Sequence, residues 1–270
     1  MNFNLIKRYD NDNLDIVSKV LKNRGVENSQ KLIDIKTYGF APNPPEAFGK
    51  ELMAAAYLIL KDALDCNKTI GLIVDSDCDG FTSAALMYNY LSVIKDPEWI
   101  KNHILIYIHE GKQHGLNDIK DQMIEDHIEL CICPDGGSND IDAQQELLAN
   151  ECDIIILDHH EVDFGSCPKN LFTKHFACIN TQLGPYPNKQ LSGVGVVYQF
   201  CKYFDQQNNW NNMDQFLDLL ALGLMGDMQD LREQETLGYI WEGFSSKDNL
   251  INPFIAAMVD KNAFSLGKAE

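Results

Sequence analysis

The sequence predicts an α/β fold, in which a parallel sheet is flanked by helices and preceded by an N-terminal helical segment. From residue 70 onward, apolar runs of strand length recur along the chain, and most of them end in polar residues. Candidate helices lie between several of these runs, and this alternation is typical of parallel sheets. With 270 residues and 45% hydrophobic content, the chain can bury a substantial core.

The first 68 residues are predicted to form a helical lead-in. A Pro-rich stretch, Ala41 to Pro45, separates its last helix from earlier ones. In that last helix, apolar residues recur at helical spacing at Leu52, Ala55, Ile59 and Ala63. Helices are therefore expected before the first strand.

Five apolar runs are the candidate buried strands. They are Ile70 to Val74, Ile104 to Ile108, Leu130 to Cys133, Ile154 to Leu157 and Ala177 to Ile179. Helices are predicted over Thr82 to Val93 and over Ile141 to Ala149. Residues 228 to 270 have a helical and polar pattern.

Acidic residues follow three of these runs. Asp75 follows the first run, Asp135 the third and Asp158 the fourth, while Asp227 ends a further apolar stretch. In an open parallel sheet the ligand site lies at the carboxyl ends of the strands. We therefore expect these four segments to converge.

The charge balance limits the possible functions. The chain has 22 Lys and Arg residues against 40 Asp and Glu residues, a formal net charge of -18. Such a surface repels polyanions, which argues against a protein that coats nucleic acid. A nucleic-acid enzyme stays open, because carboxylates that hold divalent cations are neutralised locally.

Cysteine usage and the lack of targeting signals predict a reduced, cytoplasmic protein. Among the eight Cys residues only Cys131 and Cys133 lie close together, and the missing Cys-x-x-Cys pair speaks against a zinc ribbon or a redox motif. The first residues include Lys7, Arg8 and Asp10 and lack the apolar stretch of a signal peptide. No run approaches the length of a membrane span, so no membrane partner is expected.

The segment Asp75-Ser-Asp77-Cys-Asp79-Gly80 is the first candidate for chemistry. Gly80 and the following Thr82-Ser83 indicate a turn into a helix, which can gather the three carboxylates. Oxygen ligands suit magnesium or manganese, and an added imidazole favours manganese, iron or zinc. For the three aspartates alone, a solvated loop or a helix cap is an interpretation of equal weight to a metal site. A calcium loop is excluded, because its twelfth position is Leu86 instead of Glu.

The second candidate is Asp158-His159-His160. One acid and two imidazoles at a strand end fit a metal or phosphate site, and a structural role is the alternative. Adjacent side chains on an extended backbone point in opposite directions, so one His is expected to bind metal and the other to reach the substrate. Asp135-Gly136-Gly137 and Asp227 also have simple alternatives, a loop turn and a helix-end acid.

In this order the four segments resemble the motifs of the DHH phosphoesterase superfamily. Gly71 to Ala85 is similar to the first motif, Asp135-Gly136-Gly137 to the second, Asp158-His159-His160 to the third and Leu219 to Leu231 to the fourth. Further segments resemble the RecJ-type branch of single-strand exonucleases. They are Val20 to Gly25, Ile179 to Pro187 with Leu191 to Val196, and Glu235 to Gly243.

The resemblance implies a site for two manganese or magnesium ions. The implied metal ligands are Asp77, Asp79, Asp135 as the bridge, His159 and Asp227, with Asp75 as a further or outer ligand. Asp158 and His160 are the implied catalytic pair, in which Asp158 orients its neighbours and His160 contacts the scissile phosphate.

Substrate contacts are expected at two further places. Free backbone amides at Ser192 and Gly193 are expected to meet phosphate at a helix N-terminus, and helix capping by Ser192 is the alternative. Lys112 and His114 are assigned to substrate binding, in a loop where the resembled enzymes carry an Arg and a Gly-Tyr-Gly-Leu ending. His109 and His114 stand in place of that Arg and Tyr.

The predicted organisation is a helical lead-in over 1–68, a DHH-type catalytic domain over 69–245 and a helical C-terminal segment over 246–270, the start of a linker. The resembled enzymes carry a second domain with a Gly-rich motif, whereas after Gly243 this chain has only Gly267. A separate or deleted substrate-binding domain is therefore an expected partner, beside single-stranded nucleic acid. The sequence is compatible both with an excised catalytic core and with a naturally minimal form of these enzymes.

The leading hypothesis for function is a 5′-to-3′ single-stranded-DNA exonuclease that releases mononucleotides by two-metal hydrolysis. One alternative keeps the metal centre and acts on short oligonucleotides or cyclic dinucleotides. Another is a catalytically silent binding subunit that keeps the fold.

Overall fold

The computed structural model describes residues 16–23, 25–26, 35, 39–111, 113–163, 165, 167–245 and 252–260. The strands are β1 Ile70–Val74, β2 Ile104–Ile108, β3 Leu130–Pro134, β4 Asp153–Asp158 and β5 Phe176–Asn180. The α-helices are α1 Ile16–Asn23, α4 Lys50–Cys66, α5 Cys78–Ile94, α6 Pro97–His103, α7 Lys120–Glu125, α8 Ile141–Ala149, α9 Gly193–Asn208, α10 Leu217–Gly226, α11 Gln234–Phe244 and α12 Pro253–Asp260. Two 3-10 helices, η1 Pro45–Phe48 and η2 Met213–Phe216, complete the elements of this part of the chain.

The sheet is parallel throughout, with the strand order β2-β1-β3-β4-β5. From β1 the chain first forms β2 on one side and then β3 on the other. The strand order therefore reverses between β1 and β3, and such a reversal opens the crevice in which parallel sheets bind ligands. Asp75 follows β1 and Asp135 follows β3, so both lie at this point.

The predicted parallel α/β class and all five predicted strands are confirmed. The predicted bounds of β1 and β2 are matched at both ends, and the other three strands are slightly longer than predicted. The helix predicted over Ile141 to Ala149 is α8. The helix predicted from Thr82 is α5, which begins earlier, at Cys78, because Asp77 caps it.

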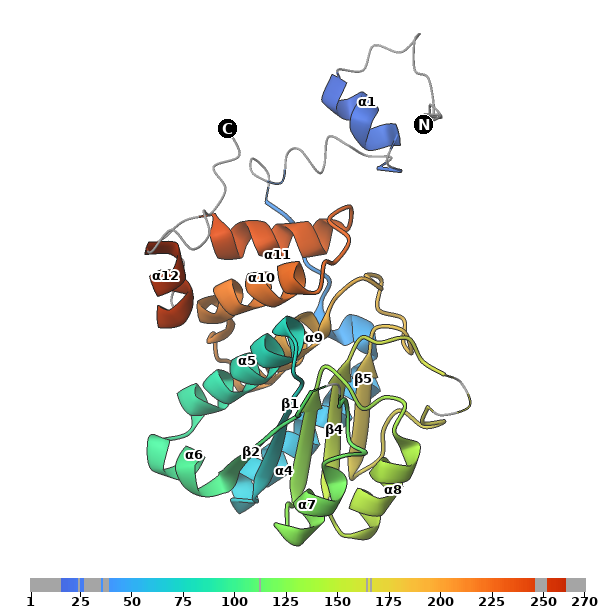
Figure 1. The fold of residues 1–270 in the computed structure, drawn as a ribbon, viewed down its shortest axis with the longest axis vertical. Helices are drawn as coiled ribbons and strands as arrows, with labels where there is room; N and C mark the ends of the chain where they lie inside the picture. Colours follow the sequence, from blue (N-terminus) through green and yellow to red (C-terminus); the bar gives the residue numbers. More distant parts are fainter. Residues whose placement is uncertain are drawn as a thin grey trace.

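Helices cover both faces of the sheet: α4, α5 and α9 lie on one face, and α7 and α8 lie on the other (Figure 1). Because strand side chains alternate between faces, neighbours on β1 serve different cores. Leu72 belongs to the larger core with α4, α5 and α9, whereas Ile73 belongs to the smaller core beneath α7 and α8. Leu60 of α4 is fully buried in the larger core, so this helix of the predicted lead-in packs directly on the sheet.

Helix α10 packs on α5 and α9, and α11 packs on α10 (Figure 1). The buried Glu235 in the first turn of α11 fixes this arrangement, because its carboxylate accepts hydrogen bonds from several distant segments. The donors are Asn43 N and Nδ2, Tyr186 Oη, Asn188 Nδ2 and Gln199 Nε2. This network holds the α10–α11 pair over the carboxyl edge of the sheet. Among the described residues, no helix is both long enough and apolar enough to cross a bilayer.

Candidate metal centre

The first acidic segment leaves β1 and turns directly into α5. Asp77 is the N-cap of α5, and its Oδ1 accepts a hydrogen bond of 2.9 Å from Gly80 N. Asp75 is buried beneath the turn, and a Cβ at Gly80 would lie 2.4 Å from the Asp75 Cβ. Only glycine therefore lets the helix begin so close to the strand. Asp79 lies in the first turn of α5 and is also buried.

Asp135 follows β3 in a backbone conformation that few residues adopt. Its φ is 59°, in the left-handed region, where Asp and Asn are better tolerated than most non-glycine residues. This conformation directs the carboxylate toward the end of β4, where His159 Nε2 lies 3.1 Å from Asp135 Oδ1. The side chain is 2% exposed, so a carboxylate is buried at the strand-order reversal.

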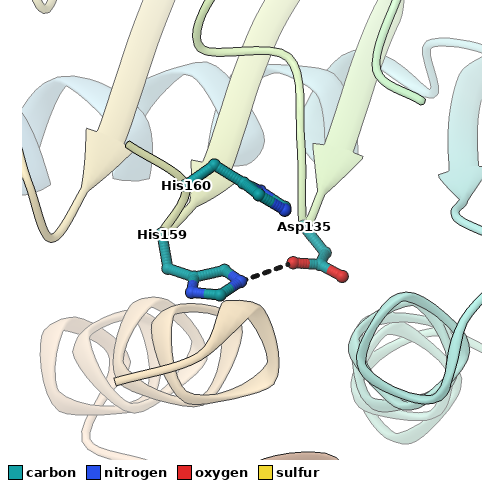
Figure 2. A group of neighbouring side chains, drawn as sticks. All are labelled: Asp135, His159 and His160. Atoms are coloured by element: carbon teal, nitrogen blue, oxygen red, sulfur yellow. Dashed lines mark ion pairs between the residues drawn. The ribbon is translucent and has the colours of Figure 1, made fainter. Parts of the chain in front are cut away.

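The two histidines lie on the same side of the chain, so the expectation that they point in opposite directions is wrong. That expectation assumed an extended backbone, but β4 ends at Asp158 and the chain bends at His160. The two imidazole rings lie with their centroids 4.6 Å apart. Figure 2 shows both rings directed toward the side chain of Asp135.

Asp227 reaches the same place from the end of α10. Its Oδ2 lies 3.6 Å from His159 Nε2 and accepts a hydrogen bond from Gln229 Nε2. The close approach of α10 to α5 depends on Gly223, where a Cβ would lie 2.3 Å from Thr82 Oγ1 and 3.0 Å from Asp79 Oδ1. The strand-end acids and Asp227 therefore converge, as the sequence predicts.

These side chains form three overlapping groups whose ligand atoms lie within 4.8 Å of one another. The groups are Asp75 with Asp77 and Asp135, Asp79 with His159 and Asp227, and Asp135 with His159 and His160. The first two share no residue, and the contact between Asp135 and His159 joins them (Figure 2). The arrangement therefore offers two adjacent sites for cations.

The electrostatics of this centre fit divalent cations. Burial, reinforced by the charge of Asp79, raises the pKa of Asp135 well above its usual value. Burial likewise raises the pKa of Asp79, although the charge of His159 partly opposes the shift. Asp135 Oδ1 is buried and accepts no hydrogen bond within the described structure. Carboxylates crowded in this way need positive charge; oxygen ligands suit magnesium or manganese, and the imidazole favours manganese, iron or zinc.

Asp158 holds the histidine pair in place. Its Oδ1 accepts hydrogen bonds from His159 N, His160 N and His160 Nδ1, at 2.7, 3.1 and 2.7 Å. Burial alone would raise the pKa of Asp158, but the hydrogen bond and charge of His160 outweigh burial and lower it. The same hydrogen bond raises the pKa of His160 to about 9, against the opposing effect of burial. The His160 side chain is half-exposed.

The expectation of a free amide at Gly193 is wrong, whereas the expectation for the Ser192 amide stays a prediction. Gly193 N donates to Asp79 Oδ2 at 2.6 Å, and Val194 N donates to Asp79 Oδ1 at 3.1 Å. Ser192 Oγ also donates to Asp79 Oδ1, at 3.0 Å, and makes no side-chain cap of α9. The N-terminus of α9 thus binds a carboxylate of the protein itself, since amides at a helix start favour negative charge.

The loop after β2 lies against the first acidic segment. His114 Nδ1 lies 2.5 Å from Asp75 Oδ2, and the His114 side chain is 60% exposed. His109 is buried and its Nε2 lies 2.9 Å from Gly115 O, so it supports the loop from within. Lys112, assigned to substrate binding, lies outside the described residues.

A pocket of about 500 Å³ opens beside the histidine pair. Its lining includes His114, Asp135, Ser138, Asn139, Asp158, His160 and Glu161. Polar side chains converge there from the ends of β3 and β4, so a ligand in the pocket would lie next to the candidate cation sites.

Comparison with known proteins identifies the family. The sequence pattern described as DHH family, N-terminal domain, matches residues 69–224. The chain belongs to the DHH family. The membership expected from the four motifs is therefore confirmed.

The curated relatives of this DHH chain are named as exonucleases. A putative SPbeta prophage-derived single-strand DNA-specific exonuclease, YorK of Bacillus subtilis strain 168, is 33% identical over 260 residues, which cover 95% of this chain and 41% of the relative. The single-stranded-DNA-specific exonuclease RecJ of Dickeya dadantii strain 3937 is 26% identical over 187 residues, which cover 64% of this chain and 31% of the relative. The chain spans less than half the length of the curated relatives it matches.

Solved structures show the same fold. RecJ of Thermus thermophilus in complex with Mn²⁺ has a TM-score of 0.68 at 18% identity, covering 93% of this chain and 35% of that one. Exonuclease RecJ bound to manganese has a TM-score of 0.67 at 20% identity, and the match covers 80% of this chain and 53% of that one. The fold of the DHH domain is thus shared with these enzymes.

Sequence reasoning missed the polar residue at the end of β5. Asn180 Nδ2 donates to Ser138 Oγ at 2.9 Å and to His160 O at 3.1 Å. The signal was present, because Asn180 ends an apolar strand in the same way as the acids that were singled out. The pattern of strand-end acids does not include it, because its side chain is an uncharged amide.

Proposed function

We propose that this chain is the catalytic part of a divalent-metal-dependent exonuclease that releases mononucleotides from the 5′ end of single-stranded DNA. The observation that carries the proposal is the pair of adjacent cation sites joined through Asp135 and His159. The names of the relatives support the substrate, and the resemblance to RecJ-type enzymes supports the polarity.

The side chains divide into two sets around the proposed cations. Asp75 and Asp77 would hold one manganese or magnesium ion, and Asp79, His159 and Asp227 the other, with Asp135 between them. When bound, such cations supply positive charge for the phosphate and lower the pKa of an attacking water.

His160 and Asp158 act on the substrate without belonging to either set. Nδ1 of the His160 ring is held by Asp158, which leaves Nε2 as the donor for a phosphate oxygen. The hydrogen bond to Asp158 raises the pKa of this imidazole to about 9, which favours its role as a donor. The pocket of about 500 Å³ beside it is large enough for a terminal nucleotide, and exposed His114 lies at its border.

A further domain, on a longer chain or a separate one, is proposed to supply much of the strand-binding surface. The net charge of -18 supports this, because phosphate contacts come from Lys and Arg. The same charge favours a smaller substrate for this chain acting alone. Short oligonucleotides or cyclic dinucleotides are therefore the second candidate.

The test compares single strands labelled at the 5′ end and at the 3′ end, in manganese and in chelator, as DNA and as RNA. Early release of the 5′ label as a mononucleotide from DNA is expected. Uncut strands with rapid cleavage of a dinucleotide would favour the second candidate. Release beginning at the 3′ end would overturn the polarity.

A silent binding subunit is tested by calorimetry. Wild type is expected to bind two Mn²⁺ ions and Asp135→Ala to lose this binding. A protein that binds no Mn²⁺ and cuts no substrate would overturn the proposed function as a whole.

A further inference from the structure

The backbone of the histidine pair lies beyond the sheet. Asp158 pairs with Asn180 as the last register pair between β4 and β5, and no further strand pairing supports the two residues that follow. Their carbonyl groups therefore have no strand partner and accept hydrogen bonds from elsewhere. The donors come from side chains of the segment after β5.

Two side-chain amides replace the missing strand partners. Asn180 Nδ2 donates to His160 O at 3.1 Å, and Gln182 Nε2 donates to His159 O at 3.2 Å. The two amides are themselves linked, because Gln182 N donates to Asn180 Oδ1 at 2.7 Å. Consecutive carbonyls of the histidine pair are therefore held by one short segment.

The same segment also reaches the loop after β3. Asn180 Nδ2 donates to Ser138 Oγ at 2.9 Å, and Ser138 N donates to Asp158 Oδ2 at 3.2 Å. Asn180 and Ser138 are each 1% exposed, so water does not compete for these bonds. The ends of β3, β4 and β5 are thus tied together beneath the candidate metal centre.

Gln182 is held from a second side. Its Nε2 also lies 2.9 Å from Lys189 O and 3.1 Å from Thr181 Oγ1, so its two hydrogens are shared among three acceptors, of which His159 O is one. The Lys189 ammonium in turn donates to Thr181 O and Gly184 O, which closes the loop on itself. The amide that contacts His159 is therefore fixed before any ligand arrives.

We propose that Asn180 and Gln182 are positioning residues for the metal centre. They touch neither the proposed cations nor the substrate, and they act by fixing the peptides that carry the two imidazoles. With both carbonyls held, the rings keep the 4.6 Å separation that directs them toward Asp135 (Figure 2). This inference rests on the proposed function.

The test uses Gln182→Met, which keeps the length of the side chain and removes its donors. Gln215→Met is the matched control, because half-buried Gln215 donates Nε2 to the backbone oxygen of Asn212 at 2.8 Å, away from the metal centre. Asn180→Asp is a second variant, which removes the donors of the buried amide at nearly constant volume. Each protein is measured for its Mn²⁺ dissociation constant by calorimetry, its kcat and KM on single-stranded DNA, and its melting temperature in chelator.

Gln182→Met is expected to bind Mn²⁺ about tenfold more weakly and to lose about tenfold in kcat, the usual effect of removing a group that orients a metal ligand. Its KM is expected to match that of the control, because the side chain contacts no substrate. Mn²⁺ affinity and kcat equal to those of Gln215→Met would overturn the inference while leaving the proposed function intact. A wild type that neither binds Mn²⁺ nor cleaves DNA would overturn both.

Discussion

Asp79 and Gly193 are 114 residues apart in the chain, and the Gly193 amide nitrogen lies 2.6 Å from Asp79 Oδ2. A helix N-terminus is thereby used to hold a proposed metal ligand. Because amide donors favour the charged carboxylate, this contact keeps Asp79 available for a cation despite its burial. The N-terminus of α9 is consequently part of the metal centre, although none of its atoms is a proposed ligand.

Substitutions at this helix start are expected to weaken metal binding to different degrees. Ser192→Ala removes one of three hydrogen bonds to Asp79 and is expected to lose a few-fold in Mn²⁺ affinity. Gly193→Ala is expected to lose much more, because the new Cβ would lie 2.5 Å from Asp135 Oδ1. Calorimetry with Mn²⁺ checks the order, with exposed Gly165→Ala as the control. Equal losses for the two variants would contradict the steric argument.

Asp135→Asn is expected to weaken Mn²⁺ binding and to stabilise the metal-free protein. Asn tolerates the positive φ at this position and removes an acid whose pKa is raised by burial and by the charge of Asp79, so the metal-free protein is expected to gain unfolding free energy at neutral pH. Saturating Mn²⁺, at 100 times its dissociation constant, should stabilise wild type by about 2.7 kcal/mol and the variant by little. Melting curves in chelator and in manganese measure both effects. A melting temperature in chelator below that of wild type would contradict the inference that the Asp135 carboxylate is destabilised by burial and by the charge of Asp79.

Glu235→Gln is expected to destabilise the protein strongly. The buried carboxylate accepts five hydrogen bonds, and a side-chain amide would direct its own NH₂ group at donors. Leaving such groups unpaired costs about 1 to 3 kcal/mol each. Urea unfolding measures the change, and Glu51→Gln on the exposed side of α4 is the control, expected within about 0.5 kcal/mol of wild type.

Lys68→Met is expected to destabilise the protein in a pH-dependent way. Lys68 Nζ lies 2.7 Å from Asp62 Oδ2 and 2.8 Å from Asp153 Oδ2. Burial alone lowers the pKa of Lys68, but the hydrogen bonds to both acids outweigh burial and raise it. A raised lysine pKa stabilises the fold below the unfolded value of about 10 and loses this effect as pH rises through the folded value.

Urea unfolding of Lys68→Met should therefore show a loss of about 1 to 3 kcal/mol at pH 7, which stays nearly constant up to about pH 10 and begins to shrink only above that pH. The more exposed pair of Lys61 and Asp65 provides the control. Lys61→Met is expected to leave the unfolding free energy close to that of wild type, because exposed ion pairs contribute little. A loss at pH 7 no larger than that of Lys61→Met would contradict the stabilisation by the two ion pairs of Lys68.

The sequence predicts much of this fold because its signals are local. The run Ile70 to Val74 is apolar on both faces and bounded by polar residues, so its ends are readable, and parallel strand ends must meet at one edge. That rule was enough to bring Asp75, Asp135 and Asp158 together. The convergence of acids that follow parallel strands can therefore be predicted wherever the sequence shows where the strands end.

Two features of the site were not predictable, because they depend on contacts between distant segments. No local pattern indicates that Ser192 donates to Asp79, since the two lie 113 residues apart. The bend after Asp158, which directs both imidazoles to one side, likewise depends on amides from the segment after β5. Residue types predicted the ligands, whereas tertiary packing determines their orientation.

The hydrogen bonds between Asp79 and the start of α9 can form only after α9 has been synthesised. At roughly 5 to 20 residues per second, Asp79 leaves the ribosome roughly 6 to 23 seconds before Gly193. During that interval the nascent chain carries its first acidic segment without the amides that later hold it. The centre is therefore completed late, and a nascent chain that stalls before α9 would present loose carboxylates to cellular cations.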